Sequence, residues 1–165
     1  MLLSTAIKYS FLSLACGDAL GVPVEFSSRE ERQHDPVKDM RSFGSHSQPA
    51  GTWSDDSALT FCLADALMEG YDLKRIGENF VRWWKEGYWS ARKEVFDIGG
   101  ATQFAIGNLT CGKHPLESAR KDEQANGNGA LMRISPMIFF CRNMSEQERW
   151  NKTSEVASIT HGHVI

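Results

Sequence analysis

The chain has 165 residues, a formal net charge of −3 and 41% hydrophobic residues, a composition typical of a folded globular domain. It has no basic run that would indicate nucleic-acid binding, and no apolar stretch approaches the roughly 20 residues that a membrane-spanning helix needs. We therefore expect one domain over residues 1–165. The cysteines lie far apart, without a Cys-x-x-Cys pair, so we expect the reduced thiols of a cytoplasmic protein at Cys16, Cys62, Cys111 and Cys141.

The first predicted element is an amphipathic helix over residues 2–16, because apolar residues recur at helical spacing from Leu3 to Ala15. The same segment has a superficial likeness to an export signal. However, no basic residue precedes its apolar part, and Lys8 interrupts that part. We therefore favour the helix over the signal.

After this helix the sequence predicts a turn at 17–21 and then a polar stretch over 27–53 without sustained periodicity. A loop of that length in a small domain is usually functional or disordered. No segment alternates as a strand does, so the elements predict an all-α fold. Two further helices are predicted over 55–69, which Gly70 ends, and over 72–86, which Asp72 caps. Another is predicted over 97–107, and a short one follows Pro115. The last two cover 130–140, with a break at Pro136, and the segment from Ser145 towards His161.

The segment Gly51–Ser57, with the sequence GTWSDDS, is the first candidate for a functional site. Ser54 or Asp55 can cap the following helix, and one acidic residue in the first turn suffices to complement its dipole. Asp55 and Asp56 together repel each other unless a positive charge lies nearby, and their oxygens suit Mg²⁺ or Mn²⁺. The local pattern favours the cap and leaves the metal site open.

Three further segments carry polar residues that suit either structure or chemistry. In GDALGVPVE, Asp18 and Glu25 either follow the end of a helix or lie in irregular chain as catalytic carboxylates. The NGNG loop over 126–129 is either a tight turn or a cradle for phosphate, and Arg133 either contacts that phosphate or forms a structural ion pair. The two histidines of THGH at 160–163 do not share one helix face, so one of them can line a pocket but a His-His metal pair is not expected.

Taken together and in this order, five segments resemble the ADP-ribosylglycohydrolase family, which includes the dinitrogenase-reductase-activating glycohydrolases. They are GDALGVPVEF, GTWSDDSALT, FDIGGATQFAI, NGNGALMRISP and ITHGH, within about residues 14–163. The resemblance implies a compact orthogonal bundle of helices with a pair of Mg²⁺ or Mn²⁺ ions at its centre. It also implies a metal-dependent hydrolase that removes ADP-ribose from a modified acceptor by cleaving an N- or O-glycosidic bond.

The resemblance also implies roles for individual residues of this sequence. Ser54, Asp55 and Asp56 match the family's metal ligands, with Ser54 in place of a threonine. Glu25 is implied as a catalytic group beside Asp55 and Asp56, either as an acid or base or as a residue that positions or gates. The residues implied in substrate binding are Asp97, Gly99, Asn126, Gly127, Asn128, Gly129 and His161.

The family's second metal-ligand motif, Asp-x-Asp followed by Thr or Ser, is absent, and Asp122 is the last aspartate. The resemblance therefore implies a member that lacks its C-terminal portion and has an incomplete second metal site. Two functions stay open: hydrolysis, or a truncated or degenerate member that binds ADP-ribose or a partner chain without catalysis. The expected partners are an ADP-ribosylated protein or another ADP-ribose conjugate, together with either a second copy or a complementing C-terminal chain; no nucleic acid or membrane is expected.

Overall fold

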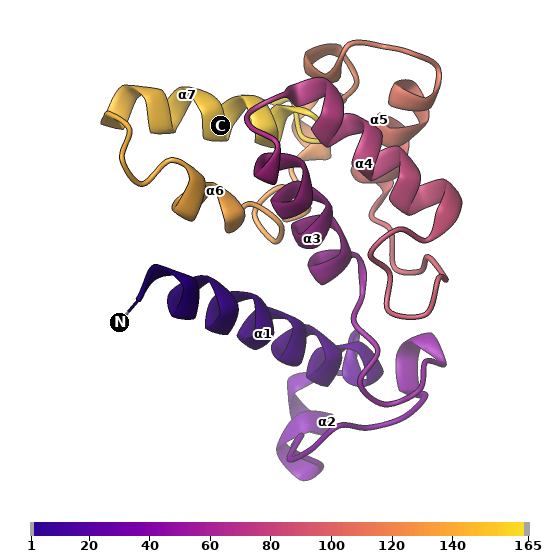
Figure 1. The fold of residues 1–165 in the computed structure, drawn as a ribbon. Coiled ribbons are helices and arrows are strands. Elements are labelled where there is room, and N and C mark those ends of the chain that lie inside the picture. Colours follow the sequence, from indigo (N-terminus) through magenta and orange to yellow (C-terminus); the bar gives the residue numbers. More distant parts are fainter. Residues whose placement is uncertain (1, 164–165) are drawn as a thin grey trace.

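The computed structural model consists of α-helices and short 3₁₀ turns, and no β-strand forms within residues 2–163, the part of the chain that the structure describes (Figure 1). This confirms the predicted all-α class. Met1 and residues 164–165, which the expected domain includes, lie outside the described residues. The α-helices are α1 (Leu3–Gly21), α2 (Arg29–His34), α3 (Asp55–Met68), α4 (Leu73–Glu86), α5 (Gly100–Thr110), α6 (Pro136–Phe140) and α7 (Glu146–Ser158).

Helix α3 lies at the centre of the fold and contacts α1, α4 and α6 (Figure 1). Its residues Leu59 and Leu63 are fully buried. A helix that is apolar around most of its surface must be covered on several sides, and α3 meets this requirement. The packing therefore fixes the N-terminus of α3, which begins with Asp55. The core residues that surround α3 include Ile76, Phe80, Trp83, Ile106, Met137 and Val156.

Helix α1 runs through the turn that the sequence predicted at 17–21, so that prediction was wrong. Inside the helix, Asp18 accepts hydrogen bonds from the backbone N–H groups of Ser54 (3.0 Å) and Ser57 (3.1 Å). It also accepts from their hydroxyls, at 2.8 Å and 2.6 Å. Asp18 thus satisfies free N–H groups at the start of α3, and these tertiary contacts stabilise a helix where the glycines suggested a turn.

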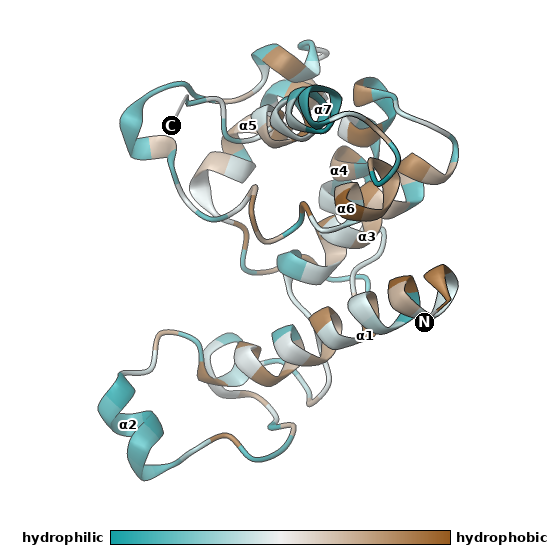
Figure 2. Cartoon of the chain, turned by 90° about the vertical axis from the view of Figure 1, so that its left-hand side faces the viewer, coloured by the Kyte–Doolittle hydropathy of each residue, from teal (hydrophilic) through white to brown (hydrophobic). Residues whose placement is uncertain are grey.

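The polar stretch over 27–53 contains a short helix, α2, that the sequence analysis did not predict. The Ser28 hydroxyl accepts from the Glu31 N–H (3.1 Å), and the Glu31 carboxylate accepts from the Ser28 N–H (2.7 Å). This capping box was visible in the sequence as a serine followed three residues later by a glutamate. Helix α2 buries none of its residues, and Figure 2 colours it hydrophilic. The helix therefore depends on its cap rather than on packing.

Helices α3, α4 and α7 begin where their N-caps predict. The side chains of Ser54, Asp72 and Ser145 each accept a hydrogen bond from a backbone N–H in the first turn of the helix that follows. At the other end of α4, Gly87 takes the left-handed conformation that commonly ends a helix. Local capping chemistry therefore predicts these three helices well.

Two other predicted helices are shorter than expected, and a third, predicted over 97–107, forms instead as α5 over Gly100–Thr110. The helix predicted from Asp97 begins instead at Gly100, because Asp97 has a φ of 56°, which no right-handed helix accommodates. The segment 130–140 is a series of turns up to Ser135 and is helical only in α6. The segment after Pro115 is a single 3₁₀ turn, η3 (Pro115–Glu117). Turn geometry replaces helix at each of these places.

The cysteines Cys16, Cys62, Cys111 and Cys141 carry free thiols, as expected from their spacing. Among residues 2–163, no helix combines the length and the apolar composition that crossing a bilayer requires.

Candidate functional site

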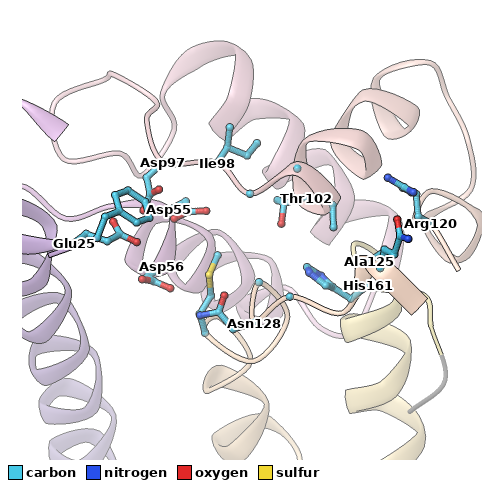
Figure 3. A pocket seen from close by; sticks show the side chains of 18 residues that line it. Glu25, Asp55, Asp56, Asp97, Ile98, Thr102, Arg120, Ala125, Asn128 and His161 are labelled. Atoms are coloured by element: carbon cyan, nitrogen blue, oxygen red, sulfur yellow. The ribbon is translucent and has the colours of Figure 1, made fainter. Parts of the chain in front are cut away.

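One pocket collects most of the residues that the sequence analysis singled out (Figure 3). Its volume is about 630 Å³, and the start of α3, the start of α5 and the loop 126–129 contribute to its wall. Ser54 does not line it, and Asn126 instead forms a side-chain hydrogen bond with His163 Nδ1 (3.1 Å). The predicted residues that line the pocket are Glu25, Asp55, Asp56, Asp97, Gly99, Gly127, Asn128, Gly129 and His161.

Four carboxylates gather at one end of the pocket, which we call the acid end: Glu25, Asp55, Asp56 and Asp97 (Figure 3). Asp55 and Asp56 form the first turn of α3, whose dipole favours negative charge. Glu25 directly follows the 3₁₀ turn η1 (Val22–Val24) at the end of α1, and Asp97 lies just before α5. The fold therefore brings four like charges from three separate segments to one place.

Burial and mutual repulsion raise the pKa values of three of these carboxyls. Asp55 is only 5% exposed, and burial, followed by the charges of Asp97 and Asp56, raises its pKa to about 8. Burial, followed by the charges of Asp18 and Asp97, raises the pKa of Asp56 to about 6. The pKa of Glu25 is also raised, chiefly by burial. Such a site favours either bound protons or a bound cation.

The acid end fits a hard divalent cation. Neither Asp55 nor Asp56 forms an ion pair with a lysine, arginine or histidine among residues 2–163. Carboxylate oxygens are the ligands that Mg²⁺ and Mn²⁺ prefer, and a cation between them would offset the repulsion that raises their pKa values. The donor set therefore agrees with the Mg²⁺ or Mn²⁺ expectation without choosing between the two metals.

The capping interpretation of GTWSDDS is confirmed. Ser54 is the N-cap of α3, and its Oγ accepts from the Asp56 N–H at 3.3 Å. The Ser54 hydroxyl in turn donates to Asp18 Oδ1 at 2.8 Å, and Ser54 faces a neighbouring cavity that Asp18, Glu25 and Asp56 also line. Capping requires the serine and the backbone, so it leaves the two aspartate side chains free for another role.

Arg120 and His161 lie at the end of the pocket away from the acids (Figure 3), and together with the pocket-lining loop residues Gly127, Asn128 and Gly129 they form what we call the loop end. A Cβ on Gly129 would lie 2.7 Å from His161 Cε1 and 2.9 Å from Thr102 Oγ1, so only glycine fits there without displacement. Arg120 is about half exposed and donates to Asp122 at 2.8 Å. This end therefore offers a cation and close backbone approach, features that suit an anionic group.

Buried groups behind the loop end hold His161 in place. Its Nδ1 lies 2.9 Å from Thr160 Oγ1, and burial together with the charge of Arg133 lowers the His161 pKa, so that the ring is neutral at pH 7. Arg133 is fully buried and donates to Thr160 Oγ1 (2.6 Å) and to the Val156 carbonyl (3.3 Å). Burial lowers its pKa to about 9, which leaves it charged at neutral pH.

Arg133 fulfils neither of the roles that the sequence suggested. It does not line the pocket, so a direct phosphate contact is not available, and no acidic side chain pairs with it among residues 2–163. Its guanidinium instead lies over the Phe80 ring, 4.8 Å from the centroid, which partly compensates the buried charge. Arg133 thus connects the segment that carries His161 to the core.

Two residues near the pocket were missed by the sequence analysis. His46 Nε2 lies 2.6 Å from Glu25 Oε2 and 3.8 Å from Asp97 Oδ1. Arg120 reaches the pocket because its backbone pairs with the His161 segment in an isolated bridge. Neither belongs to a local motif, and both depend on contacts between distant parts of the chain, so no signal in the sequence could have identified them.

Several known proteins are similar to this chain. The family model described as ADP-ribosylglycohydrolase matches residues 3–165. The ADP-ribosylarginine hydrolase Tri1 of Pseudomonas putida is 34% identical over 157 residues, which cover 93% of this chain and 41% of that protein. The ADP-ribosyl-[dinitrogen reductase] glycohydrolase of Rhodospirillum rubrum is 29% identical over 161 residues, which cover 94% of this chain and 51% of that protein.

A solved structure extends this similarity to three dimensions. It is described as an ADP-ribosylglycohydrolase-related protein complex and matches with a TM-score of 0.73 and 31% sequence identity. The match covers 93% of this chain and 48% of that one. The chain thus spans about two fifths to one half of the length of these relatives.

Proposed function

This chain belongs to the ADP-ribosylglycohydrolase family, and we propose that its pocket binds ADP-ribose and supports hydrolysis of the glycosidic bond between ADP-ribose and a modified acceptor. The observation that carries the proposal is the chemical contrast between the two ends of one pocket, four carboxylates facing an arginine and a glycine-containing loop. ADP-ribose has a matching contrast, because its ribose hydroxyls suit a metal-carboxylate site and its diphosphate suits cations and backbone N–H groups.

At the acid end, Asp55 and Asp56 are the proposed carboxylate ligands of Mg²⁺ or Mn²⁺. The Ser54 hydroxyl donates one hydrogen bond and accepts another, which leaves one lone pair of its oxygen for the same role. A divalent cation bound there supplies Lewis-acid polarisation and neutralises the clustered negative charge. Asp55 and Asp56 would thus hold the cation beside the ribose hydroxyls of the ligand.

Glu25 is the proposed acid or base of the reaction. Its raised pKa brings proton exchange closer to neutral pH, which a group that both accepts and returns a proton requires. Glu25 would take a proton from water as the water oxygen bonds to the anomeric carbon, and it would return that proton to the acceptor as the glycosidic bond breaks. The transition state has oxocarbenium character, which nearby carboxylates such as Asp97 stabilise.

At the loop end, the backbone of Gly127, Asn128 and Gly129 is proposed to contact the diphosphate, with the Arg120 guanidinium beside it. His161, neutral at pH 7, offers a ring nitrogen for a hydrogen bond without adding charge. Asp97, at the acid end, and Gly99, directly before α5, are proposed to contact the ribose. Asn126 would act indirectly, by holding the loop through its hydrogen bond to His163.

A second candidate function is the binding of ADP-ribose, or of a partner chain, without turnover. It is favoured by one specific observation, that no aspartate follows Asp122, so a second aspartate-rich ligand motif is absent from these 165 residues. In that case the acid end would bind a cation less completely, and the loop end would still bind the diphosphate.

The direct test is release of ADP-ribose from a peptide that carries ADP-ribosylated arginine, since the Pseudomonas putida relative is named an ADP-ribosylarginine hydrolase. A peptide that carries ADP-ribosylated serine is tested in parallel. We expect release with Mn²⁺ or Mg²⁺, and loss of release with EDTA or in the Asp55→Asn/Asp56→Asn variant. Binding of ADP-ribose without release would support the second function. If the folded chain neither binds ADP-ribose nor releases it, hydrolysis and ADP-ribose binding are both wrong, and only the binding of a partner chain is left.

A further inference from the structure

His46 contacts two carboxylates of the acid end from outside the pocket. Its Nε2 lies 2.6 Å from Glu25 Oε2 and 3.8 Å from Asp97 Oδ1, yet His46 is not among the residues that line the pocket. The His46 side chain is 13% exposed, whereas the Glu25 side chain is 39% exposed. The imidazole is therefore the more enclosed partner and supports a carboxylate that faces the open pocket.

Two aromatic rings lie beside the imidazole, and one of them, Phe26, is itself 82% exposed. The Phe26 ring centroid lies 5.7 Å from that of His46, and the Phe96 centroid lies 5.3 Å from it. Each phenylalanine is the chain neighbour of one of the acids, since Phe26 follows Glu25 and Phe96 precedes Asp97. The same two short segments therefore supply both the carboxylates and the rings that lie beside the histidine.

The segment that carries His46 has a demanding backbone. Phe43 and Ser47 have φ values of 67° and 54°, a region that costs a non-glycine residue about 1 kcal/mol or more. A Cβ on Gly44 would lie 1.9 Å from the Pro23 carbonyl oxygen, so the segment lies directly against η1. Backbone strain of this kind persists only where the surrounding structure enforces it, and it is concentrated at functional sites.

Contacts with η1 and with the residues after it explain what enforces this geometry. The Ser45 hydroxyl donates to the backbone carbonyl of Glu25 at 2.5 Å. Within the segment, the Phe43 N–H donates to the Gln48 carbonyl, and Gln48 is 6% exposed. The segment 43–48 thus binds both the backbone and the side chain of Glu25.

We propose that His46 is a positioning residue that holds Glu25 for the hydrolysis reaction, an inference that rests on the proposed function. The imidazole donates its Nε2 proton to Glu25 Oε2, which leaves Oε1 to exchange a proton in the pocket. Without that hydrogen bond the half-exposed carboxylate would sample other rotamers, and a displacement of about 1 Å from the productive geometry can reduce a rate by about 100-fold.

Kinetics of His46→Ala, Glu25→Gln and the double variant test this proposal. We expect His46→Ala to lower kcat by about 10-fold or more while KM changes by less than about twofold, because the substrate contacts remain. His46→Gln should recover part of the lost kcat, since its amide can donate to the same oxygen. In the Glu25→Gln background, His46→Ala should have no further effect. The matched control is His34→Ala on the exposed helix α2.

Three results would overturn the proposal. One is an unchanged kcat in His46→Ala, and another is the same fold loss with and without the Glu25 carboxylate. The third is a weakened affinity for Mn²⁺ in His46→Ala, since that result would make His46 a metal ligand. Circular dichroism verifies that each variant is folded, and His46→Gln and Glu25→Gln still decide the question if His46→Ala does not fold.

Failure of the proposed function has a different signature. If the wild-type chain releases no ADP-ribose, the ¹⁵N NMR signals of the His46 ring test the contact in the ligand-free chain. We expect protonated Nε2 in the wild type and a shifted Nε2 signal in Glu25→Gln, with no shift in the control variant Asp39→Asn. If the His46 Nε2 chemical shift is the same in the wild type and in Glu25→Gln, the positioning role is contradicted.

Discussion

The two ends of the pocket are built in opposite ways. The acid end is made of side chains whose negative charges are forced together, so that burial and repulsion raise the pKa of Asp55 to about 8. The loop end is made largely of backbone, with Gly129 against His161 and the cation of Arg120 beside them. The acid end therefore needs a cation or protons to offset the repulsion between its carboxylates. The loop end has no such repulsion, and its binding depends on shape.

This contrast predicts which substitutions affect which ligand. Changes at the acid end should act first on cation binding and on the pH dependence of stability. Changes at the loop end should act on ADP-ribose affinity and leave cation binding intact. The predictions below run from the largest expected effect to the smallest.

The double substitution Asp55→Asn/Asp56→Asn should weaken Mn²⁺ binding by at least about 100-fold, because amide oxygens carry no charge to offset that of the ion. Calorimetric titration of MnCl₂ measures it. Asp39→Asn, an exposed aspartate outside the pocket, is the control and should leave the affinity unchanged. Unchanged Mn²⁺ affinity in the double variant would show that the cation does not bind at the acid end.

Asp18→Ala should lower the free energy of unfolding by about 2 kcal/mol, because it leaves two backbone N–H groups and two hydroxyls at the start of α3 without their acceptor. Urea unfolding measures the change, and Asp72→Ala, which removes an exposed cap of α4, should cost about 1 kcal/mol. A smaller loss for Asp18 than for Asp72 would mean that α3 is not held by α1.

The metal-free protein should lose stability as the pH rises from 5 to 8.5, by up to about 1.4 kcal/mol per pH unit for the one extra proton that the folded state holds on Asp55. The folded pKa of Asp55, about 8, lies above the unfolded value of 3.8, so the folded state binds more protons between those values. Its contribution is therefore complete below pH 3.8 and lost as the pH rises through 8. Urea unfolding in EDTA measures the slope.

His161 should produce the opposite slope at more acidic pH. Its folded pKa is lowered below 6.5, so its contribution is present above that value and lost as the pH falls through the folded pKa. Asp55→Asn should remove the loss of stability between pH 6.5 and pH 8.5, and His161→Gln should remove only the opposite contribution below pH 6.5. If the free energy of unfolding of Asp55→Asn still falls between pH 6 and pH 8.5 as in the wild type, the carboxyl with the raised pKa is not that of Asp55.

Gly129→Ala should weaken ADP-ribose binding by about fivefold, since the added Cβ must displace His161 or Thr102, an overpacking cost of about 1 kcal/mol. Gly127→Ala is the matched control, because its Cβ would meet His161 Nε2 at an ordinary 3.7 Å. Calorimetry with ADP-ribose compares the two. Equal losses would show that the loop end does not depend on this close approach.

How much of the fold the sequence could predict depends on the range of the interactions that form each helix end. Caps act within one turn, so Ser54 and Asp72 predicted the starts of α3 and α4. The extension of α1 through 17–21 could not be predicted, because it depends on hydrogen bonds between Asp18 and residues of α3. Local signals are enough for helix ends but not for contacts between helices.

The site shows the same division. Motif resemblance led to residues at both ends of the pocket, including Asp55 at the acid end and Gly129 at the loop end. It missed His46, which lies in a polar stretch and meets Glu25 only after the chain folds. The secondary-structure prediction, in turn, placed a helix start at Asp97, because a left-handed φ at an aspartate leaves no mark in the sequence. Supporting residues therefore required the structure.

The central claim is that one pocket binds ADP-ribose by two ends of unlike chemistry, and calorimetric titration of ADP-ribose with and without Mn²⁺ tests it most directly. The account predicts one binding site per chain, with an affinity that falls in EDTA and in Asp55→Asn/Asp56→Asn, and falls separately in Gly129→Ala without any change in Mn²⁺ binding. Absence of ADP-ribose binding by folded, Mn²⁺-loaded wild-type chain would contradict it.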